Sequence, residues 1–177
     1  LFESTERTFT LHSCAACRCL FLYPMPSDEE LAGFYPSQYW WNGSKAQSSA
    51  TLKKLESVYR RLALRDHVAF VMRAAGNHSG LHLLDVGCGS GTLLGLLKQR
   101  GFRPIGVDFS HEAATVAETE NGVRVIVGSL EGAGFSAESL DVVTLFHVME
   151  HVTSPRSVLA EVARILKPGG VLNLQVP

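Results

Sequence analysis

The sequence predicts an α/β fold in which helices cover both faces of a parallel sheet, preceded by a small irregular segment. Between residues 81 and 176, short apolar runs rich in β-branched residues alternate with stretches of helical periodicity. This is the pattern of repeated β-α-β units. A glycine-rich loop at residues 87–91 follows the first of these runs. The chain has 177 residues, 46% of them hydrophobic, so it can bury a core of ordinary domain size.

The chain divides into two regions. Residues 1–50 are rich in cysteine and aromatic residues, and the polar run at 46–50 reads as a linker to the core at 51–177. The core opens with a helix predicted over residues 51–75, because Leu52, Leu55, Tyr59 and Leu62 recur at helical spacing. A run with glycine at both ends, residues 76–80, is expected to stop this helix.

Strands and helices are then predicted in alternation. Ser110 is a suitable N-cap for the helix predicted to run to residue 121, and Glu112 is favourable in its first turn. The last predicted helix should end at the Lys-Pro-Gly-Gly run of residues 167–170. The predicted strands cover residues 81–86, 104–108, 123–127, 140–146 and 171–176, and the predicted helices cover 92–100, 110–121 and 155–166.

The glycine loop is the first candidate binding element. Gly87, Gly89 and Gly91 stand where a strand must turn sharply into a helix and where backbone N–H groups can face a ligand. A dinucleotide-binding loop starting at Gly87 would need glycine at position 92, which is Thr92. The spacing therefore argues against a dinucleotide site. A tight turn without a ligand is the alternative.

The second candidate is Asp108, at the end of the next predicted strand. An acidic residue there can accept hydrogen bonds from both hydroxyls of a ribose lying over the glycine loop. Phe109 could then pack on an adenine face. A helix cap or a solvated strand end is the alternative reading of Asp108.

Together these stretches resemble the class I S-adenosylmethionine-dependent methyltransferases, in the branch related to ubiquinone-pathway and sugar methyltransferases. The resemblance covers residues 81–177 and rests on the runs at 84–91, 106–108, 140–143 and 150–170. It implies a Rossmann-like fold and S-adenosylmethionine as cofactor, with Asp108 on the ribose and Phe146 and His147 beside the sulfonium. The residues implied around the methionine part are Asp85, Gly87, Gly89 and Gly91, and Cys88 between them is also assigned to the cofactor site.

One stretch departs from the family pattern. Relatives often have Gly-Asp after the third strand, with the acid on the adenine amine, whereas this chain has Gly128 and Ser129. Ser129 can still hydrogen-bond, Glu131 is an alternative, and Leu130 is also assigned to the cofactor site. The adenine contact is therefore less defined than the ribose contact.

His147, Glu150 and His151 follow the fourth predicted strand. Their H-x-x-E-H spacing also describes a zinc-protease helix, but here the motif lies between a strand and a Ser-Pro pair. Either histidine could be the general base for a hydroxyl acceptor, or the cluster could hold the loop through local hydrogen bonds. Some relatives bind Mg²⁺ here with Glu where this chain has His147, so an oxygen-preferring ion is disfavoured.

Cys14 and Cys17 have the spacing of one zinc knuckle. Cys19 and His12 are too close in sequence to complete one site, so a partner knuckle is expected upstream of this sequence. The segment also resembles the N-terminal part of some bacterial methyltransferases, including sugar C-methyltransferases, which often have Gly in place of Arg18. Free thiols on a hairpin are the alternative. Nearby aromatic residues are expected to pack or to form a lid: Tyr35, Tyr39, Trp40 and Trp41.

The resulting hypothesis is a methyltransferase acting on a small molecule such as a sugar or phenol. A non-catalytic cofactor-binding module is the second hypothesis. A nucleic-acid methyltransferase is the third, and the net charge of −1 argues against it. Crowded cysteines and the lack of a spanning apolar run favour a reducing, cytoplasmic setting. The resemblance implies seven strands, so we expect a C-terminally truncated domain with residues 171–176 at the sheet edge, open to self-association.

Overall fold

The computed structural model describes residues 8–27, 30, 58–76 and 78–177, and its contacts divide the chain into units 1–40 and 41–177. The linker expected near residue 50 and the aromatic cluster of residues 35–41 lie outside the described residues. Each unit is described by itself below.

The first unit contains a short antiparallel hairpin. Strand β1 (Thr10–Ser13) pairs with β2 (Leu20–Tyr23) in the register Thr10 to Tyr23 and Ser13 to Leu20. The turn between them is closed by backbone hydrogen bonds from Cys14 N–H to Cys19 O (2.9 Å) and from Arg18 N–H to Cys14 O (2.8 Å). Arg18 has a φ of 61°, the left-handed conformation that glycine adopts more readily.

The second unit opens with helical residues 58–63, a turn at Leu64, and helix α3 (Arg65–Ala75). The helix predicted over residues 51–75 is thus interrupted at one residue in its described part. Helical hydrogen bonds continue across the interruption, since Leu64 N–H donates to Arg60 O and Val68 N–H to Leu64 O. Gly76 ends α3, as the sequence predicts.

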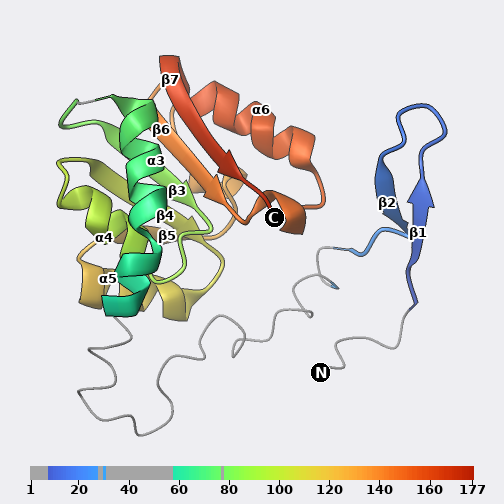
Figure 1. Ribbon diagram of the computed structural model, residues 1–177, viewed down its shortest axis with the longest axis horizontal. Helices are drawn as coiled ribbons and strands as arrows, with labels where there is room; N and C mark the ends of the chain where they lie inside the picture. The colour runs from blue at the N-terminus through green and yellow to red at the C-terminus, as the bar shows by residue number, and fades with distance from the viewer. Residues whose placement is uncertain (1–7, 28–29, 31–57, 77) are drawn as a thin grey trace, which may run out of the picture. The chain divides into compact units, whose positions relative to one another are not determined.

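A five-stranded parallel sheet forms the centre of this unit (Figure 1), in the order β5-β4-β3-β6-β7. Strand β3 lies in the middle, so the glycine loop that follows it opens at the centre of the carboxyl edge. The strands are β3 (His82–Val86), β4 (Arg103–Asp108), β5 (Arg124–Val127), β6 (Leu140–Phe146) and β7 (Leu166–Gln175), and the helices between them are α4 (Thr92–Lys98), α5 (His111–Asn121) and α6 (Pro155–Ile165).

Two apolar cores lie on the two faces of the sheet. Helices α3, α4 and α5 cover one face, where Val71, Leu94 and Ala117 are fully buried. Helix α6 covers the other face through Val162 and Ile165. Because side chains alternate along a strand, Leu83 packs on the first face and Leu84 on the second. The predicted Rossmann-like layering is confirmed.

The last strand differs from the prediction in where it begins. It starts at Leu166, not at Val171, and the Lys-Pro-Gly-Gly run lies inside it. Leu140 pairs with Leu166 but Val142 pairs with Val171, so residues 167–170 bulge opposite one residue of β6. The Lys-Pro-Gly-Gly run therefore forms a bulge in the strand, but it does not end the pairing of β7 with β6. Among the described residues β7 pairs only with β6, which confirms its place at the edge.

Candidate functional site

The glycine loop after β3 is held in a conformation that favours glycine. Gly87, Gly89 and Gly91 have φ values of 70°, 51° and 68°, all left-handed. A Cβ on Gly91 would approach Ala117 Cβ to 2.8 Å and Val123 Cγ2 to 2.7 Å. Gly91 is therefore needed for the packing of α4 against α5.

Gly89 differs from Gly91 in facing open space. Apart from Gly89 itself and its two chain neighbours, no atom of the described residues lies within 4 Å of the position that its Cβ would take. Its N–H donates to Asp108 Oδ2 (2.7 Å), and Ser110 N–H donates to Asp108 Oδ1 (2.9 Å). The carboxylate of Asp108 thus joins the glycine loop to the start of α5, beside the open space over Gly89.

Asp85 is buried near the end of β3, two residues before Gly87. It is 5% exposed, and Thr144 Oγ1 donates to its Oδ1 at 2.6 Å. Burial raises the pKa of Asp85 to about 7; the hydrogen bond from Thr144 opposes this rise and the charge of Asp108 adds to it. Asp85 and Asp108 therefore make the centre of the carboxyl edge acidic, an environment suited to a ligand that carries positive charge.

The raised pKa of Asp85 should appear in the pH dependence of stability. The carboxyl titrates near 3.8 in the unfolded chain and near 7 in the folded chain. Between these values the folded chain holds a proton that the unfolded chain has lost, so the free energy of unfolding should fall as pH rises and then level off above pH 7. Asp85→Asn should remove this fall. Urea denaturation of both proteins across that range tests it, and parallel pH curves would show that Asp85 titrates normally.

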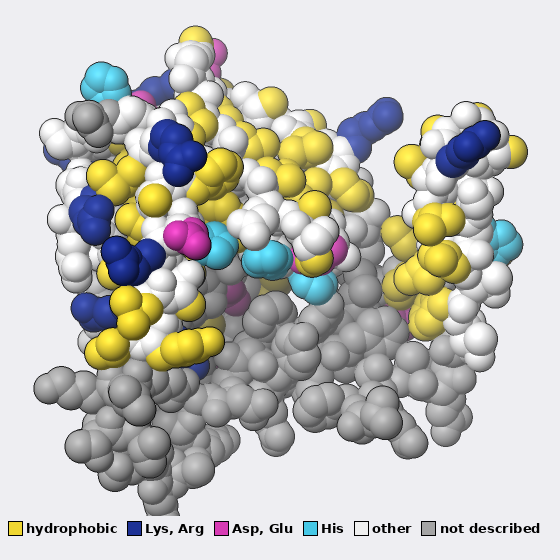
Figure 2. Space-filling model, in the orientation of Figure 1, with side chains coloured by type: hydrophobic (Ala, Val, Ile, Leu, Met, Phe, Trp, Pro, Cys, Tyr) yellow, Lys and Arg dark blue, Asp and Glu magenta, His cyan; other side chains and the backbone are white. Residues whose placement is uncertain are grey.

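The loop after β6 brings the histidine cluster to the same edge. His147 N–H donates to Gln175 O (2.9 Å), and His147 has a φ of 57°. Glu150 Oε1 lies 3.7 Å from His147 Nδ1 and 4.0 Å from His151 Nε2. Figure 2 shows histidine side chains gathered between α3 and the C-terminal end of β7. The motif forms a single short 3₁₀ turn, Met149–His151, not a metalloprotease helix.

The other cofactor-site residues differ in what they can offer. Phe109 is 79% exposed, so its ring is open to a planar ligand. Ser129 Oγ accepts from Gly132 N–H (3.0 Å). Leu130 is buried in the core under α6, and Cys88 packs beside Gly106 against the core on the other face of the sheet. Burial raises the pKa of the Cys88 thiol. Leu130 and Cys88 could therefore contact a ligand mainly through their backbone.

The three N-terminal cysteines share the hairpin turn of the first unit. Cys17 and Cys19 are exposed, and Cys14 is half-buried. Hydrogen bonds from the Cys19 backbone and the Cys14 side chain hold the pKa of the Cys17 thiol below its ordinary value. Within the part of the chain that the structure describes, no group of three or more His, Cys, Asp or Glu side chains could hold a metal ion.

Three polar residues near the site were missed in the sequence analysis. Thr144 holds Asp85, and both Thr144 and Asn173 are completely buried on the sheet. His67 of α3 packs on Phe146, with ring centroids 4.8 Å apart. A polar residue inside an otherwise apolar strand was the available signal for Thr144 and Asn173. The neighbours of His67 come from distant parts of the sequence, so no local pattern marks it.

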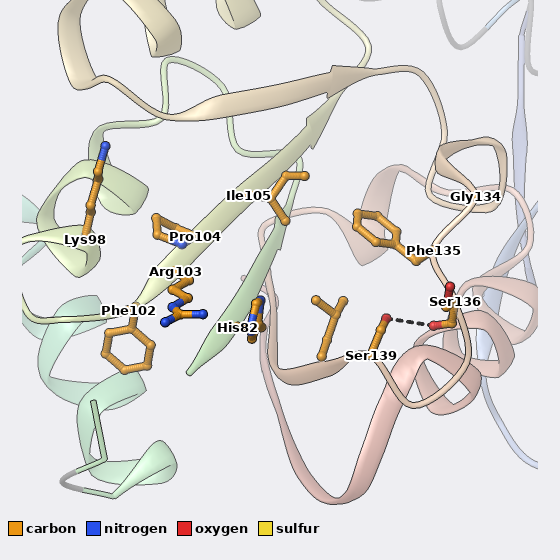
Figure 3. A pocket seen from close by; sticks show the side chains of 11 residues that line it. His82, Lys98, Phe102, Arg103, Pro104, Ile105, Gly134, Phe135, Ser136 and Ser139 are labelled. Atoms are coloured by element: carbon orange, nitrogen blue, oxygen red, sulfur yellow. Dashed lines mark hydrogen bonds between the residues drawn. The ribbon is translucent and has the colours of Figure 1, made fainter. Parts of the chain in front are cut away.

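A hollow at the opposite edge of the sheet is not part of this site (Figure 3). It is lined at the amino ends of the strands by His82, Arg103 and Ser139, whose hydroxyl donates to Ser136 O at 2.7 Å. Ligands of open parallel sheets bind beyond the carboxyl ends of the strands.

The described residues contain no helix that is long and apolar enough to cross a membrane.

Comparison with known proteins identifies a family that matches the part of the chain containing this edge of the sheet. The methyltransferase-domain family matches residues 84–174. The chain is 41% identical over 99 residues to a ubiquinone biosynthesis O-methyltransferase of Hahella chejuensis, covering 52% of this chain and 42% of that protein. It is 33% identical over 149 residues to the enzyme of the same name from Cronobacter sakazakii, covering 80% and 57%. The chain thus spans about half the length of the curated relatives it matches.

Solved structures agree with the sequence relatives. The YcgJ protein of Bacillus subtilis superimposes with a TM-score of 0.55 at 30% identity, covering 60% of this chain and 48% of that one. A TehB-like SAM-dependent methyltransferase of Corynebacterium glutamicum gives a TM-score of 0.55 at 25% identity, covering 71% and 72%. The family match includes the glycine loop, Asp108 and the loop after β6.

Proposed function

This chain belongs to the class I S-adenosylmethionine-dependent methyltransferases, and from that membership we propose that it binds S-adenosylmethionine at the carboxyl edge of the sheet and methylates a small molecule. The observation that carries the proposal is the carboxylate of Asp108, anchored by Gly89 N–H and Ser110 N–H beside open space. A carboxylate has about four acceptor positions. Two are used here, so two remain for the hydroxyls of a ribose.

The residues around this space fit the rest of the cofactor. The exposed ring of Phe109 can stack on adenine, and the acidic pair Asp85 and Asp108 complements a cationic ligand. Bound S-adenosylmethionine would supply a methyl group on a positively charged sulfur. The work left for the protein is mainly to orient the acceptor in line with that methyl group. We propose that Phe146 and His147, at the end of β6, form that part of the site.

We propose a hydroxyl of a phenol-like or sugar-like molecule as the acceptor, because the relatives are named ubiquinone biosynthesis O-methyltransferases. A carbon acceptor is the alternative. A hydroxyl must lose its proton on methylation, and His151 or His147 would accept it. Glu150, within 4.0 Å of both imidazoles, can orient either ring.

His151→Ala tests the proposed base. Methyl transfer from labelled S-adenosylmethionine to catechol should fall roughly 100- to 10,000-fold, as expected when a general base is lost. The affinity for S-adenosylhomocysteine should stay within about twofold, since His151 is not assigned to the cofactor. His78→Ala, at the amino edge of the sheet, is the matched control. An unchanged transfer rate would make His151 a scaffold residue. A parent protein that binds cofactor but methylates neither phenols nor sugars would favour the non-catalytic module.

We also propose a structural zinc ion bound through Cys14 and Cys17 in the full-length protein. The supporting observations are that all four cysteines are free thiols and that the hairpin turn brings Cys14 and Cys17 together. Free thiols also suit a cytoplasmic setting. Metal analysis of a full-length preparation made without chelator should find about one zinc per chain, and Cys17→Ser should abolish it. A metal-free preparation would leave Cys14 and Cys17 as plain thiols.

A further inference from the structure

The hollow at the amino edge of the sheet (Figure 3) is chemically unlike the proposed cofactor site. It has a volume of about 740 Å³, which is within the range of small-molecule sites. The carboxyl edge is acidic through Asp85 and Asp108. The charged side chains among the described residues that line the hollow are instead all basic, namely His82, Lys98 and Arg103. This lining favours an anion.

A short connection between strands explains why the hollow is open. The chain passes from β5 to β6 through residues 128–139, which contain a single 3₁₀ turn, Glu131–Ala133, and no α-helix. Parallel strands are usually joined by an α-helix that packs on the sheet. Because that helix is replaced by a loop on the α6 face, Ile105 and Leu140 of the core on this face line the hollow.

The basic side chains of His82 and Arg103 stand together. The two residues are Cα partners in the pairing of β3 with β4, so their side chains point to the same face of the sheet. Both residues are exposed. Among the described residues, the Arg103 guanidinium has no hydrogen-bond or ion-pair partner, whereas Lys98 Nζ donates to Gly122 O at 2.6 Å. Arg103 is therefore the cation of this lining with its donors available to a ligand.

The carboxylate of Asp141, beside His82, does not cancel this positive charge. Its Oδ2 accepts from His82 N–H at 2.8 Å, and its Oδ1 accepts from Lys167 Nζ at 2.7 Å. The ion pair with Lys167 balances the charge of Asp141, which is not among the residues that line the hollow. The hollow thus keeps the charges of Arg103 and Lys98.

Aromatic rings flank the basic pair. Figure 3 shows His82 and Arg103 between Phe102 and Phe135. Phe102 belongs to the core on the α3 face of the sheet, and Phe135 packs against the core on the α6 face, so both rings are held in place. A flat apolar molecule can pack on such rings and on a guanidinium plane. A guanidinium also binds a carboxylate through two parallel hydrogen bonds.

We propose that this hollow is a second ligand site, which binds a small aromatic carboxylate through Arg103 and the rings of Phe102 and Phe135. The site is separate from the proposed cofactor site, because His82 and Arg103 begin β3 and β4 whereas Asp108 ends β4. Strand β4 has 6 residues, a length of roughly 20 Å. A ligand in the hollow should therefore neither require S-adenosylhomocysteine nor compete with it.

Titration with 1-naphthoate tests the proposal, and the neutral alcohol 1-naphthalenemethanol is the matched ligand. The parent protein should bind 1-naphthoate with a Kd on the order of 1 mM or lower, and the alcohol at least about tenfold more weakly. Arg103→Glu replaces attraction by repulsion and should weaken 1-naphthoate binding at least about tenfold. Arg73→Glu, in the last turn of α3 and outside the hollow, makes the same change in net charge and should bind like the parent.

Mapping of NMR shifts locates the bound probe and covers a failure of Arg103→Glu to fold. In the parent protein, 1-naphthoate should shift the backbone amide signals of His82, Arg103 and Phe135 and leave those of Gly89 and Asp108 in place, with or without saturating S-adenosylhomocysteine. Shifts confined to Gly89 and Asp108, equal affinity for the acid and the alcohol, equal affinity in parent and Arg103→Glu, or no binding of 1-naphthoate would overturn the inference.

The same titrations keep this inference distinct from the proposed function. A parent protein that binds 1-naphthoate in the hollow but does not bind S-adenosylhomocysteine would contradict the proposed function and support the second site. A parent protein that binds S-adenosylhomocysteine but not 1-naphthoate would do the reverse.

Discussion

Asp108→Ala is expected to weaken S-adenosylhomocysteine binding by about 10- to 150-fold, which corresponds to roughly 1.5–3 kcal/mol for hydrogen bonds to a charged acceptor. The substitution removes the acceptor for the ribose hydroxyls. It also releases Gly89 N–H and Ser110 N–H, which Asp108 holds at 2.7 and 2.9 Å. Both the direct contact and the position of the glycine loop are then lost.

Calorimetric titration with S-adenosylhomocysteine measures this loss. Asp108→Asn keeps the shape and one acceptor oxygen, so its affinity should lie between those of the parent and the alanine variant. Glu118→Gln removes an exposed carboxylate from the neighbouring helix α5 and should bind like the parent. Equal affinities in the parent and Asp108→Ala would remove Asp108 from the cofactor site.

Alanine substitutions at Gly89 and Gly91 should separate ligand binding from stability. Both residues have positive φ, so each substitution costs roughly 1–2 kcal/mol of backbone strain. At Gly91 the new methyl group also meets Ala117 and Val123, adding about 1–3 kcal/mol of overpacking. At Gly89 it enters open space, where the cofactor is proposed to lie. We therefore expect Gly91→Ala to lose more unfolding free energy than Gly89→Ala, and Gly89→Ala to lose mainly cofactor affinity.

Urea denaturation and calorimetry on the same two preparations provide the comparison. In Gly89→Ala the unfolding midpoint should shift modestly, while S-adenosylhomocysteine binding falls by at least about tenfold. In Gly91→Ala the midpoint should shift further, and the protein that remains folded should still bind. If Gly89→Ala kept full affinity, the open space over the loop would not be where the ligand lies.

The periodic elements of the fold could be predicted from sequence because their signals are local. The β-branched run before Val127, the apolar run ending at Phe146 and the Ser110 cap each specify an element without help from distant residues. The cap is confirmed, since Ser110 Oγ accepts from Ala113 N–H at 3.1 Å. The glycine spacing and Asp108 likewise led to the proposed site, because close backbone approach and the proposed ribose contact call for particular residues at fixed positions.

What sequence reasoning missed depends on contacts between distant segments. Residues 167–170 read as the end of a helix, yet Leu166 pairs with Leu140 across the sheet and starts the strand earlier. Asn173 stands in an apolar run whose register with Thr144 and Asp85 is set only by folding. His67 shares its helix with the core residues Val68 and Val71, so its place beside Phe146 depends on how α3 packs.

The central claim is that the carboxyl edge of this sheet binds S-adenosylmethionine and not a dinucleotide. Parallel calorimetric titrations of the parent protein with S-adenosylhomocysteine and with NAD test it most directly. We predict saturable one-to-one binding of S-adenosylhomocysteine that Asp108→Ala weakens, with NAD binding at least about 100-fold weaker, a difference of roughly 2.7 kcal/mol. Equal or tighter binding of NAD, or no binding of S-adenosylhomocysteine, would contradict the account.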